Sequence, residues 1–90
     1  MRDDDRVELD APPKFAAGDK VRSRQRIRND GSYLGRRIGE TLIDEGEIGY
    51  VRSIGTFLQR HFIFEVDFVD RGVVVGMRGK ELVLIEASER

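Results

Sequence analysis

Apolar and polar residues alternate along much of the chain with a period of two, which is typical of β-strands that bury one face. Between Val21 and Arg28 every second residue is an arginine. Between Phe62 and Phe68, three phenylalanines and a valine alternate with other residues, two of them acidic. We therefore expect one strand in each segment, with the Phe62, Phe64, Val66 and Phe68 side chains facing the core.

Three further segments are predicted to be strands. Glu47 to Ile54 and Leu82 to Ile85 are rich in β-branched and aliphatic residues, and Val73 to Val75 is too apolar to have a solvent-exposed face. The sequence Asp70-Arg71-Gly72 predicts a tight turn before Val73, and Arg78-Gly79-Lys80 predicts a polar kink before the last strand. The chain thus contains about five short strands, and its ten glycines fit closely spaced turns.

A long segment, Asn29 to Asp44, separates the first two predicted strands. A helix over Arg36 to Glu45 is an alternative, but Gly39 inside it and Gly46 after it make that helix short, and we favour a hooked loop. This order of elements predicts an all-β fold, a small SH3-like barrel of about five antiparallel strands with a long hooked loop between strands one and two.

The ends of the chain differ from its centre. Residues 1–13 are predicted to form a disordered acidic tail, because three consecutive aspartates repel one another and Pro12-Pro13 stiffens the approach to the domain. Residues 14–86 are predicted to form the barrel domain, and residues 87–90 a frayed C-terminus.

Composition restricts the cellular setting. The 16 basic and 17 acidic side chains give a net charge of -1, which argues against general binding to nucleic acid or membranes but not against a local charged patch. The absence of cysteine favours a reducing compartment. The charged N-terminus does not resemble a signal peptide, and no apolar run approaches the roughly 20 residues of a membrane span. We therefore expect a cytoplasmic protein.

The sequence offers no recognisable catalytic site. It has one histidine, His61, no cysteine and no glycine-rich phosphate-binding motif. Glu65 and Asp67 are better explained as charges on the solvent face of a strand than as a catalytic pair. A single imidazole with scattered carboxylates also gives no usable metal site. We predict no enzyme activity, cofactor or metal, and expect the chain to act by binding another macromolecule.

The alternating arginines are one candidate binding surface. On a continuous strand, Arg22, Arg24, Arg26 and Arg28 would project from the same side, with Lys20 in phase. Neighbouring guanidinium groups about 7 Å apart repel by about 0.6 kcal/mol in water, so the row needs a partner. Either carboxylates of the chain or an anionic partner surface could supply the opposite charge, and composition does not decide between them. The candidate carboxylates are Glu40, Asp44, Glu45, Glu65 and Asp67.

Two loops, Arg28 to Gly35 and Ile54 to Gln59, are the other candidate surface, since exposed apolar residues on adjacent loops often bind partners. We expect Tyr33 and Leu34 to be exposed, whereas Phe57 and Leu58 either face solvent or plug the barrel end. The predicted partner-binding residues are Arg22, Arg24, Arg26, Arg28, Asn29, Asp30, Tyr33, Phe57, Leu58 and Gln59.

The order of several short motifs resembles the NifZ family of nitrogen-fixation accessory proteins. The motifs include Gly18-Asp19-Lys20-Val21-Arg22, Ile27-Arg28-Asn29-Asp30-Gly31-Ser32-Tyr33-Leu34-Gly35, Gly46-Glu47-Ile48-Gly49-Tyr50-Val51 and Ile54-Gly55-Thr56-Phe57-Leu58-Gln59. The resemblance extends roughly from Phe15 to Leu84. One departure is Leu34, where the family usually has proline, which leaves this loop less rigid.

The resemblance implies a non-enzymatic, chaperone-like factor that assists maturation of the nitrogenase molybdenum–iron protein, specifically assembly of its P-clusters. The implied partners are the immature molybdenum–iron protein and other maturation factors. An SH3-like nucleic-acid-binding module that uses the Arg22, Arg24, Arg26 and Arg28 side chains on phosphates is the alternative.

Overall fold

A computed structural model gives the fold of the chain and describes residues 8–89. All regular structure in this range is β-strand or short 3-10 turn. The strands are β1 (Lys20–Ser23), β2 (Ile27–Arg28), β3 (Thr41–Ile43), β4 (Ile48–Phe57), β5 (His61–Phe68), β6 (Val73–Met77) and β7 (Leu82–Glu86). The 3-10 turns are η2 (Glu8–Asp10), η3 (Val69–Arg71) and η4 (Gly79–Glu81).

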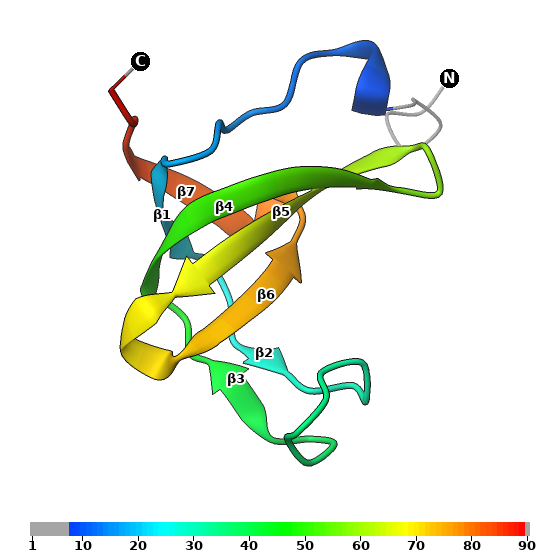
Figure 1. Ribbon diagram of the computed structural model, residues 1–90, viewed down its shortest axis with the longest axis vertical. Helices are drawn as coiled ribbons and strands as arrows, with labels where there is room; N and C mark the ends of the chain where they lie inside the picture. The colour runs from blue at the N-terminus through cyan, green and yellow to red at the C-terminus, as the bar shows by residue number, and fades with distance from the viewer. Residues whose placement is uncertain (1–7, 90) are drawn as a thin grey trace.

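Five strands form one antiparallel sheet in the order β6-β5-β4-β1-β7, while β2 and β3 form a separate two-stranded sheet. Figure 1 shows β4 as a long curved strand that spans the main sheet. Its register with β5 shifts between Val51 and Ser53, an irregularity that lets a strand bend. The prediction of an all-β, SH3-like fold with five antiparallel strands is confirmed.

The core lies on the inner face of this sheet. Phe64, Val66 and Phe68 of β5 are all buried, as the alternation in the sequence predicted. Phe15, from the segment before β1, packs edge-on against Phe64 with ring centroids 5.1 Å apart. Burying each such side chain contributes about 1.5–3 kcal/mol to folding, so β5 and its neighbours supply much of the stability of a small domain.

The strand predicted at Val73 to Val75 extends to Met77, and it alternates between buried and more accessible positions. Val74 is half-buried and Gly76 is exposed. The prediction that this strand has no solvent face is therefore wrong. The physical reason is that successive residues of a strand face opposite sides of the sheet, so Val73, Val75 and Met77 lie in the core while Val74 and Gly76 lie on the outer face.

The strand predicted from Val21 to Arg28 is interrupted, contrary to expectation. The Ser23 hydroxyl donates to the Gln25 carbonyl at 2.6 Å, and the Arg24 amide donates to the Glu81 carbonyl at 2.8 Å, so the chain bends away from β1. It re-forms as β2, which pairs with β3 at the base of the long loop. The hooked loop is confirmed, and β3 occupies part of the segment for which a helix was the alternative.

Both ends of the described chain make specific contacts. The Glu8 amide donates to the Arg60 carbonyl at 2.9 Å, and the Ser88 amide donates to the Asp19 carboxylate at 2.9 Å. Residues 1–7 of the predicted tail and Arg90 of the predicted frayed end lie outside the described residues. The predicted tight turn at Asp70-Arg71-Gly72 is confirmed, with Gly72 in the left-handed conformation at φ 68°.

Candidate partner-binding surfaces

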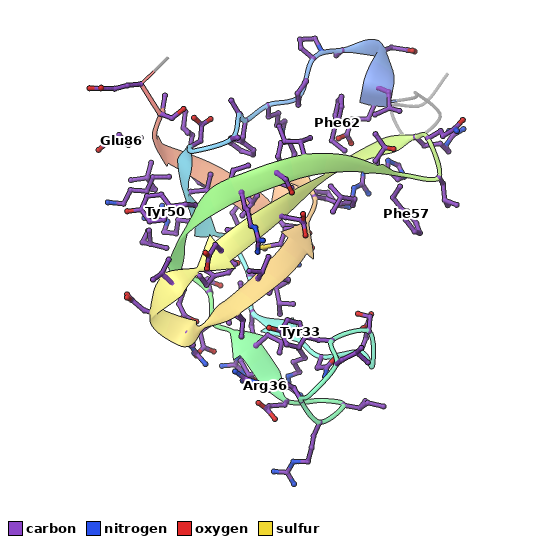
Figure 2. The ribbon with its side chains drawn as sticks, in the orientation of Figure 1. Tyr33, Arg36, Tyr50, Phe57, Phe62 and Glu86 are labelled. Atoms are coloured by element: carbon purple, nitrogen blue, oxygen red, sulfur yellow. The ribbon has the colours of Figure 1, made fainter. Side chains whose placement is uncertain are left out.

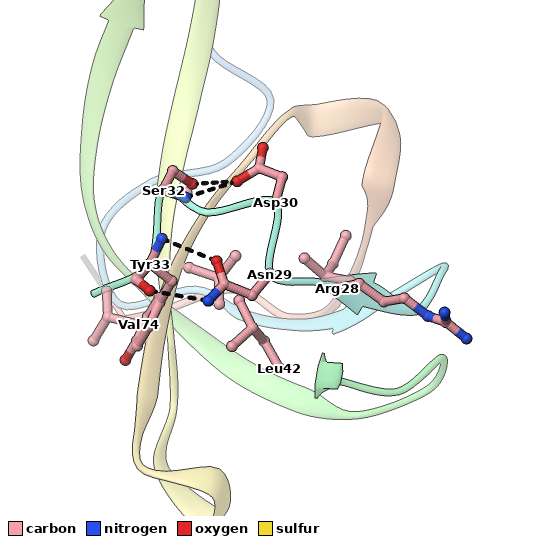
Figure 3. A pocket seen from close by; sticks show the side chains of 10 residues that line it. Arg28, Asn29, Asp30, Ser32, Tyr33, Leu42 and Val74 are labelled. Carbon is pink, nitrogen blue, oxygen red and sulfur yellow. Dashed lines mark hydrogen bonds between the residues drawn. The ribbon is translucent and has the colours of Figure 1, made fainter. Parts of the chain in front are cut away.

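The hooked loop is organised around the Asn29 side chain, which is 2% exposed. Its Nδ2 lies 3.0 Å from the Tyr33 carbonyl, 2.9 Å from the Arg36 carbonyl and 3.2 Å from the Arg37 carbonyl. Its Oδ1 accepts from the amides of Gly31 at 2.9 Å and Tyr33 at 3.1 Å. Figure 3 shows this side chain reaching across the loop to Tyr33. Asn29 thus shapes the loop from inside, and its direct contact with a partner stays a prediction.

Asp30, the next residue, is exposed and stabilises the same turn. Its carboxylate accepts from the Ser32 hydroxyl at 2.6 Å and from the Ser32 amide at 3.0 Å. These hydrogen bonds hold the pKa of Asp30 below its ordinary value. Asp30 therefore presents a carboxylate of fixed orientation at the surface of the loop.

A hollow of about 290 Å³ lies between the hooked loop and the edge strand β6. Tyr33, Leu42 and Val75 contribute to its walls, and Figure 3 looks into it. Tyr33 is half-buried and packs against the core, so the prediction that it is exposed is wrong. Leu34 is 88% exposed, as predicted.

The predicted arginine row is divided by the bend after Ser23. Arg26 pairs with Asp44, with 3.0 Å between Nε and Oδ1, whereas Arg22 and Arg28 are exposed and make no ion pair with any described residue. The Arg24 guanidinium lies 3.5 Å from the Lys80 carbonyl. Internal pairing thus explains Arg26 alone. The unbroken row that a nucleic-acid interface would have used is absent from residues 20–28.

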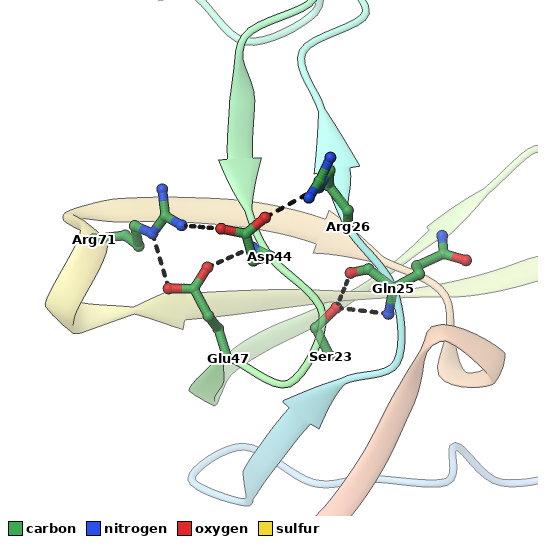
Figure 4. Close-up of polar contacts among 6 residues, drawn as sticks. All are labelled: Ser23, Gln25, Arg26, Asp44, Glu47 and Arg71. Atoms are coloured by element: carbon green, nitrogen blue, oxygen red, sulfur yellow. Dashed lines mark hydrogen bonds and ion pairs between the residues drawn. The ribbon is translucent and has the colours of Figure 1, made fainter.

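Asp44 belongs to a larger ion-pair cluster with Arg71 and Glu47, shown in Figure 4. Arg71 Nη2 lies 2.7 Å from Asp44 Oδ2, and Arg71 Nε lies 2.8 Å from Glu47 Oε1. Glu47 also accepts a hydrogen bond from the Asp44 amide. The Arg71 hydrogen bond is the main reason that the pKa of Glu47 lies below its ordinary value. The cluster joins η3 to the turn before β4, so we assign it to stability.

The β4–β5 hairpin ends in a turn with unusual backbone geometry. Phe57 pairs with His61 at the end of the ladder, and the Arg60 amide closes the turn by donating to the Phe57 carbonyl at 3.0 Å. Leu58 and Gln59 both have positive φ, 54° and 52°. Hairpin turns with this pattern favour Asn-Gly or Gly residues, and other residues there cost about 1 kcal/mol each.

The side chains of this turn project outward. Phe57 is 54% exposed and Leu58 is 73% exposed, so the alternative that they plug the barrel end is wrong. Phe15 and Phe62 pack against the core beside Phe64 instead. Phe57, Leu58, Gln59 and Arg60, which we call the hairpin tip, therefore form an exposed protrusion.

A brace from the N-terminal segment holds the base of the hairpin tip. The Phe62 amide donates to Glu8 Oε1 at 3.1 Å across 54 residues of sequence, and Arg78 Nη2 donates to Glu8 Oε2 at 3.3 Å across 70 residues. His61 Nδ1 lies 3.2 Å from the same Arg78 nitrogen. Sequence reasoning missed Glu8, His61 and Arg78 as a group, because no local pattern connects residues so far apart.

The two loops predicted to be adjacent are separate. Figure 1 places the hooked loop and the hairpin tip in different parts of the molecule, and Figure 2 shows Tyr33 well apart from Phe57. No hydrogen bond or ion pair connects them within residues 8–89. The physical reason is that β2 and β3 carry the hooked loop away from the main sheet, whereas the tip continues β4 and β5. The chain therefore presents two distinct candidate surfaces.

The sequence pattern of the NifZ domain matches residues 12–84. The chain belongs to the NifZ family. Members of this family are accessory proteins implicated in nitrogen fixation. The matched range includes both the hooked loop and the hairpin tip, but it begins after Glu8, so one member of the brace lies outside it.

Individual NifZ relatives align over most of the chain. It is 48% identical over 79 residues to a putative NifZ protein of Sinorhizobium fredii, an alignment that covers 88% of this chain and 73% of the relative. It is 43% identical over 75 residues to a probable NifZ protein of Rhodobacter capsulatus, covering 83% of this chain and 96% of the relative. Protein NifZ of Azotobacter vinelandii is 43% identical over 75 residues, covering 83% of this chain but only 47% of the longer relative. No solved structure matches the chain.

Two further features of this NifZ-family chain bear on its chemistry. In residues 8–89, no group of three or more potential ligands is arranged to hold a metal ion. The helical segments in the same range are too short to cross a membrane.

Proposed function

We propose that this chain is a non-enzymatic, chaperone-like accessory factor in the cytoplasm that binds the immature nitrogenase molybdenum–iron protein and assists assembly of its P-clusters. Membership of the NifZ family supports the link to nitrogen fixation. The finer role rests on the kind of surface that the chain offers to a larger protein.

The observation that carries the proposal is the exposure of large apolar side chains on turns of a small, well-packed barrel. Leu34 on the hooked loop and Phe57 and Leu58 on the hairpin tip all face solvent. Exposure of such apolar side chains to water is unfavourable, and their burial against a partner is favourable. They lie on two separate surfaces, so a client could be contacted at two points.

The chain contains no cysteine, so it offers no thiolate to an iron–sulfur cluster. Its contribution to P-cluster assembly would be to hold the client, whose own residues ligate the cluster. Such a factor must bind the immature client more tightly than the finished one, because only a difference in affinity between the two states can drive release. Other maturation factors could share the complex through the second surface.

The test is a binding measurement with purified molybdenum–iron protein in two forms, one lacking P-clusters and one mature. The expected result is strong binding to the immature form and weak binding to the mature form. Equal affinity for both forms would remove the basis for a chaperone cycle. A parallel titration with a labelled oligonucleotide at low ionic strength checks the nucleic-acid alternative, for which the divided arginine row predicts no binding.

A further inference from the structure

We infer that the hairpin tip inserts into an apolar pocket with an acidic rim on the client, and that the Glu8 brace holds the tip in its binding conformation. This inference rests on the proposed function and specifies which part of the chain the client recognises. Four features of the tip support it.

The first feature is backbone strain in two residues whose side chains are exposed. Leu58 and Gln59 adopt the left-handed conformation that glycine and asparagine favour. Leu58 is the more exposed of the two apolar residues at the tip, so it recovers little by packing within the chain. The fold alone would be more stable with Asn-Gly in this turn, and strained residues of this kind point to a use outside the fold.

The second feature is the pairing of an aromatic and an aliphatic side chain on one narrow protrusion. Phe57 and Leu58 are neighbours at the end of a two-stranded ribbon, where they offer apolar area without a surrounding flat face. Figure 2 shows Phe57 pointing away from the body of the protein. This shape fits a concave apolar pocket better than a flat surface.

The third feature is charge. Arg60 is exposed in the same turn, and its guanidinium makes no ion pair within the described chain. Glu8, the acidic group that hydrogen bonds at the base of the tip, is already bound to the Arg78 side chain and the Phe62 amide. The tip therefore presents a cation beside its apolar residues, which an acidic rim on the partner would complement.

The fourth feature is the brace itself. Glu8 bonds to the last residue of the tip and to the strand that follows it, since its amide donates to the Arg60 carbonyl and its carboxylate accepts from the Phe62 amide. These contacts restrict a turn that buries little of its own surface. A turn held rigid before binding loses less conformational entropy on binding, so the brace strengthens association without touching the client. Glu8 is thus a positioning residue.

The experiment measures binding of the full chain to immobilised immature molybdenum–iron protein lacking P-clusters. The double substitution Leu58→Asn with Gln59→Gly relieves the strain and removes Leu58, the more exposed of the two apolar side chains at the tip. It is expected to raise the thermal unfolding midpoint of the chain while weakening client binding by about tenfold or more. Val69→Asn is the matched control, since Val69 is an exposed apolar residue in the turn at the opposite end of β5, and it should leave binding unchanged.

A double-mutant cycle tests the brace. Glu8→Ala should weaken client binding several-fold in the otherwise unchanged chain, and should have no further effect in the chain that already carries Leu58→Asn and Gln59→Gly. A purely structural role for Glu8 predicts the same loss in both backgrounds, and this result would overturn the positioning role.

The outcomes separate the inference from the proposed function. Binding by the unchanged chain with equal binding by the Leu58→Asn, Gln59→Gly variant overturns the tip as the contact and leaves the proposed function standing. An equal loss in Val69→Asn shows that exposed apolar residues act without regard to place, and also overturns the inference. Absence of binding by the unchanged chain overturns both.

Discussion

Replacing Asn29 with alanine should destabilise the protein, because it removes the side chain that organises the hooked loop. The Asn29 side chain lies within hydrogen-bond distance of three carbonyls through Nδ2 and of two amides through Oδ1. The Nδ2 group has only two hydrogens, so at most four hydrogen bonds count, and a net contribution of about 1 kcal/mol for each gives an upper limit of about 4 kcal/mol. Arg36 and Arg37 are exposed, so water can replace the hydrogen bonds that Asn29 makes to their carbonyls. We therefore expect the free energy of unfolding to fall by about 2–3 kcal/mol.

Urea unfolding at pH 7 measures this loss directly. In a domain of this size, it also corresponds to a fall of roughly 10–20 °C in the thermal midpoint. Ser32→Ala is the control, because it removes only the exposed hydroxyl bond to Asp30 and should change stability by less than about 0.5 kcal/mol. Should Asn29→Ala fall in the same small range as the control, the Asn29 side chain would not be what organises the loop.

Three further predictions concern the barrel. Gly49→Ala should lower the free energy of unfolding, measured by urea unfolding, by about 1–3 kcal/mol, because a Cβ there would lie 2.6 Å from Val66 Cγ1. Gly55→Ala in the same strand is the control, since a Cβ there meets nothing within 4 Å and should be tolerated. Phe64→Ala should cost about 3–5 kcal/mol, since the side chain is fully buried against Phe15. The pKa of Glu47 is lower in the folded protein than in the unfolded chain. The ionised Glu47 therefore stabilises the fold fully at pH values above the ordinary glutamate pKa, and this stabilisation is lost as the pH falls through the lower pKa of the folded state. Thermal midpoints of the unchanged chain should therefore fall more steeply below about pH 4.5 than those of Glu47→Gln, and parallel curves would contradict the role of the Arg71 contact.

The parts of the fold that could be predicted from sequence are those fixed by local periodicity. The inward face of β5 follows directly from the alternation between Phe62 and Phe68, because successive side chains on a strand point to opposite sides. The hooked loop could be predicted for a similar reason, since Gly39 and Gly46 disfavour the competing helix. The arginine alternation has the same period and nevertheless gave a wrong strand.

That failure has a non-local cause. The bend after Ser23 is held by the Arg24 amide bond to the Glu81 carbonyl and by the Gly46 amide bond to the Ser23 carbonyl. Neither partner can be identified from the neighbouring sequence. Alternation shows that a segment is compatible with a strand, but hydrogen bonds to distant residues decide where the strand ends.

The candidate surfaces show the same difference between what local sequence predicts and what distant contacts decide. Asn29-Asp30-Gly31 is a strong turn signal, and the structure has a turn there, but burial of Asn29 depends on carbonyls up to eight residues away. At the hairpin tip, Leu58 and Gln59 carry no sequence signal for positive φ, because neither is glycine or asparagine. Strain and the Glu8 brace become visible only when the two strands and the N-terminal segment are placed together.

The geometry of the tip also limits how a chaperone cycle can operate. For the proposed chaperone-like factor, a small barrel with a braced turn has little freedom to change shape, so we expect discrimination between immature and mature client to arise on the client. Fully burying a phenylalanine or leucine side chain contributes about 1.5–3 kcal/mol, and Phe57 and Leu58 have 54% and 73% of their surface still to bury. Together they could add about 2–4 kcal/mol, which is a factor of roughly 30 to 1,000 in affinity. Closing one client pocket during maturation would therefore be sufficient to release the factor, without any conformational change in this chain.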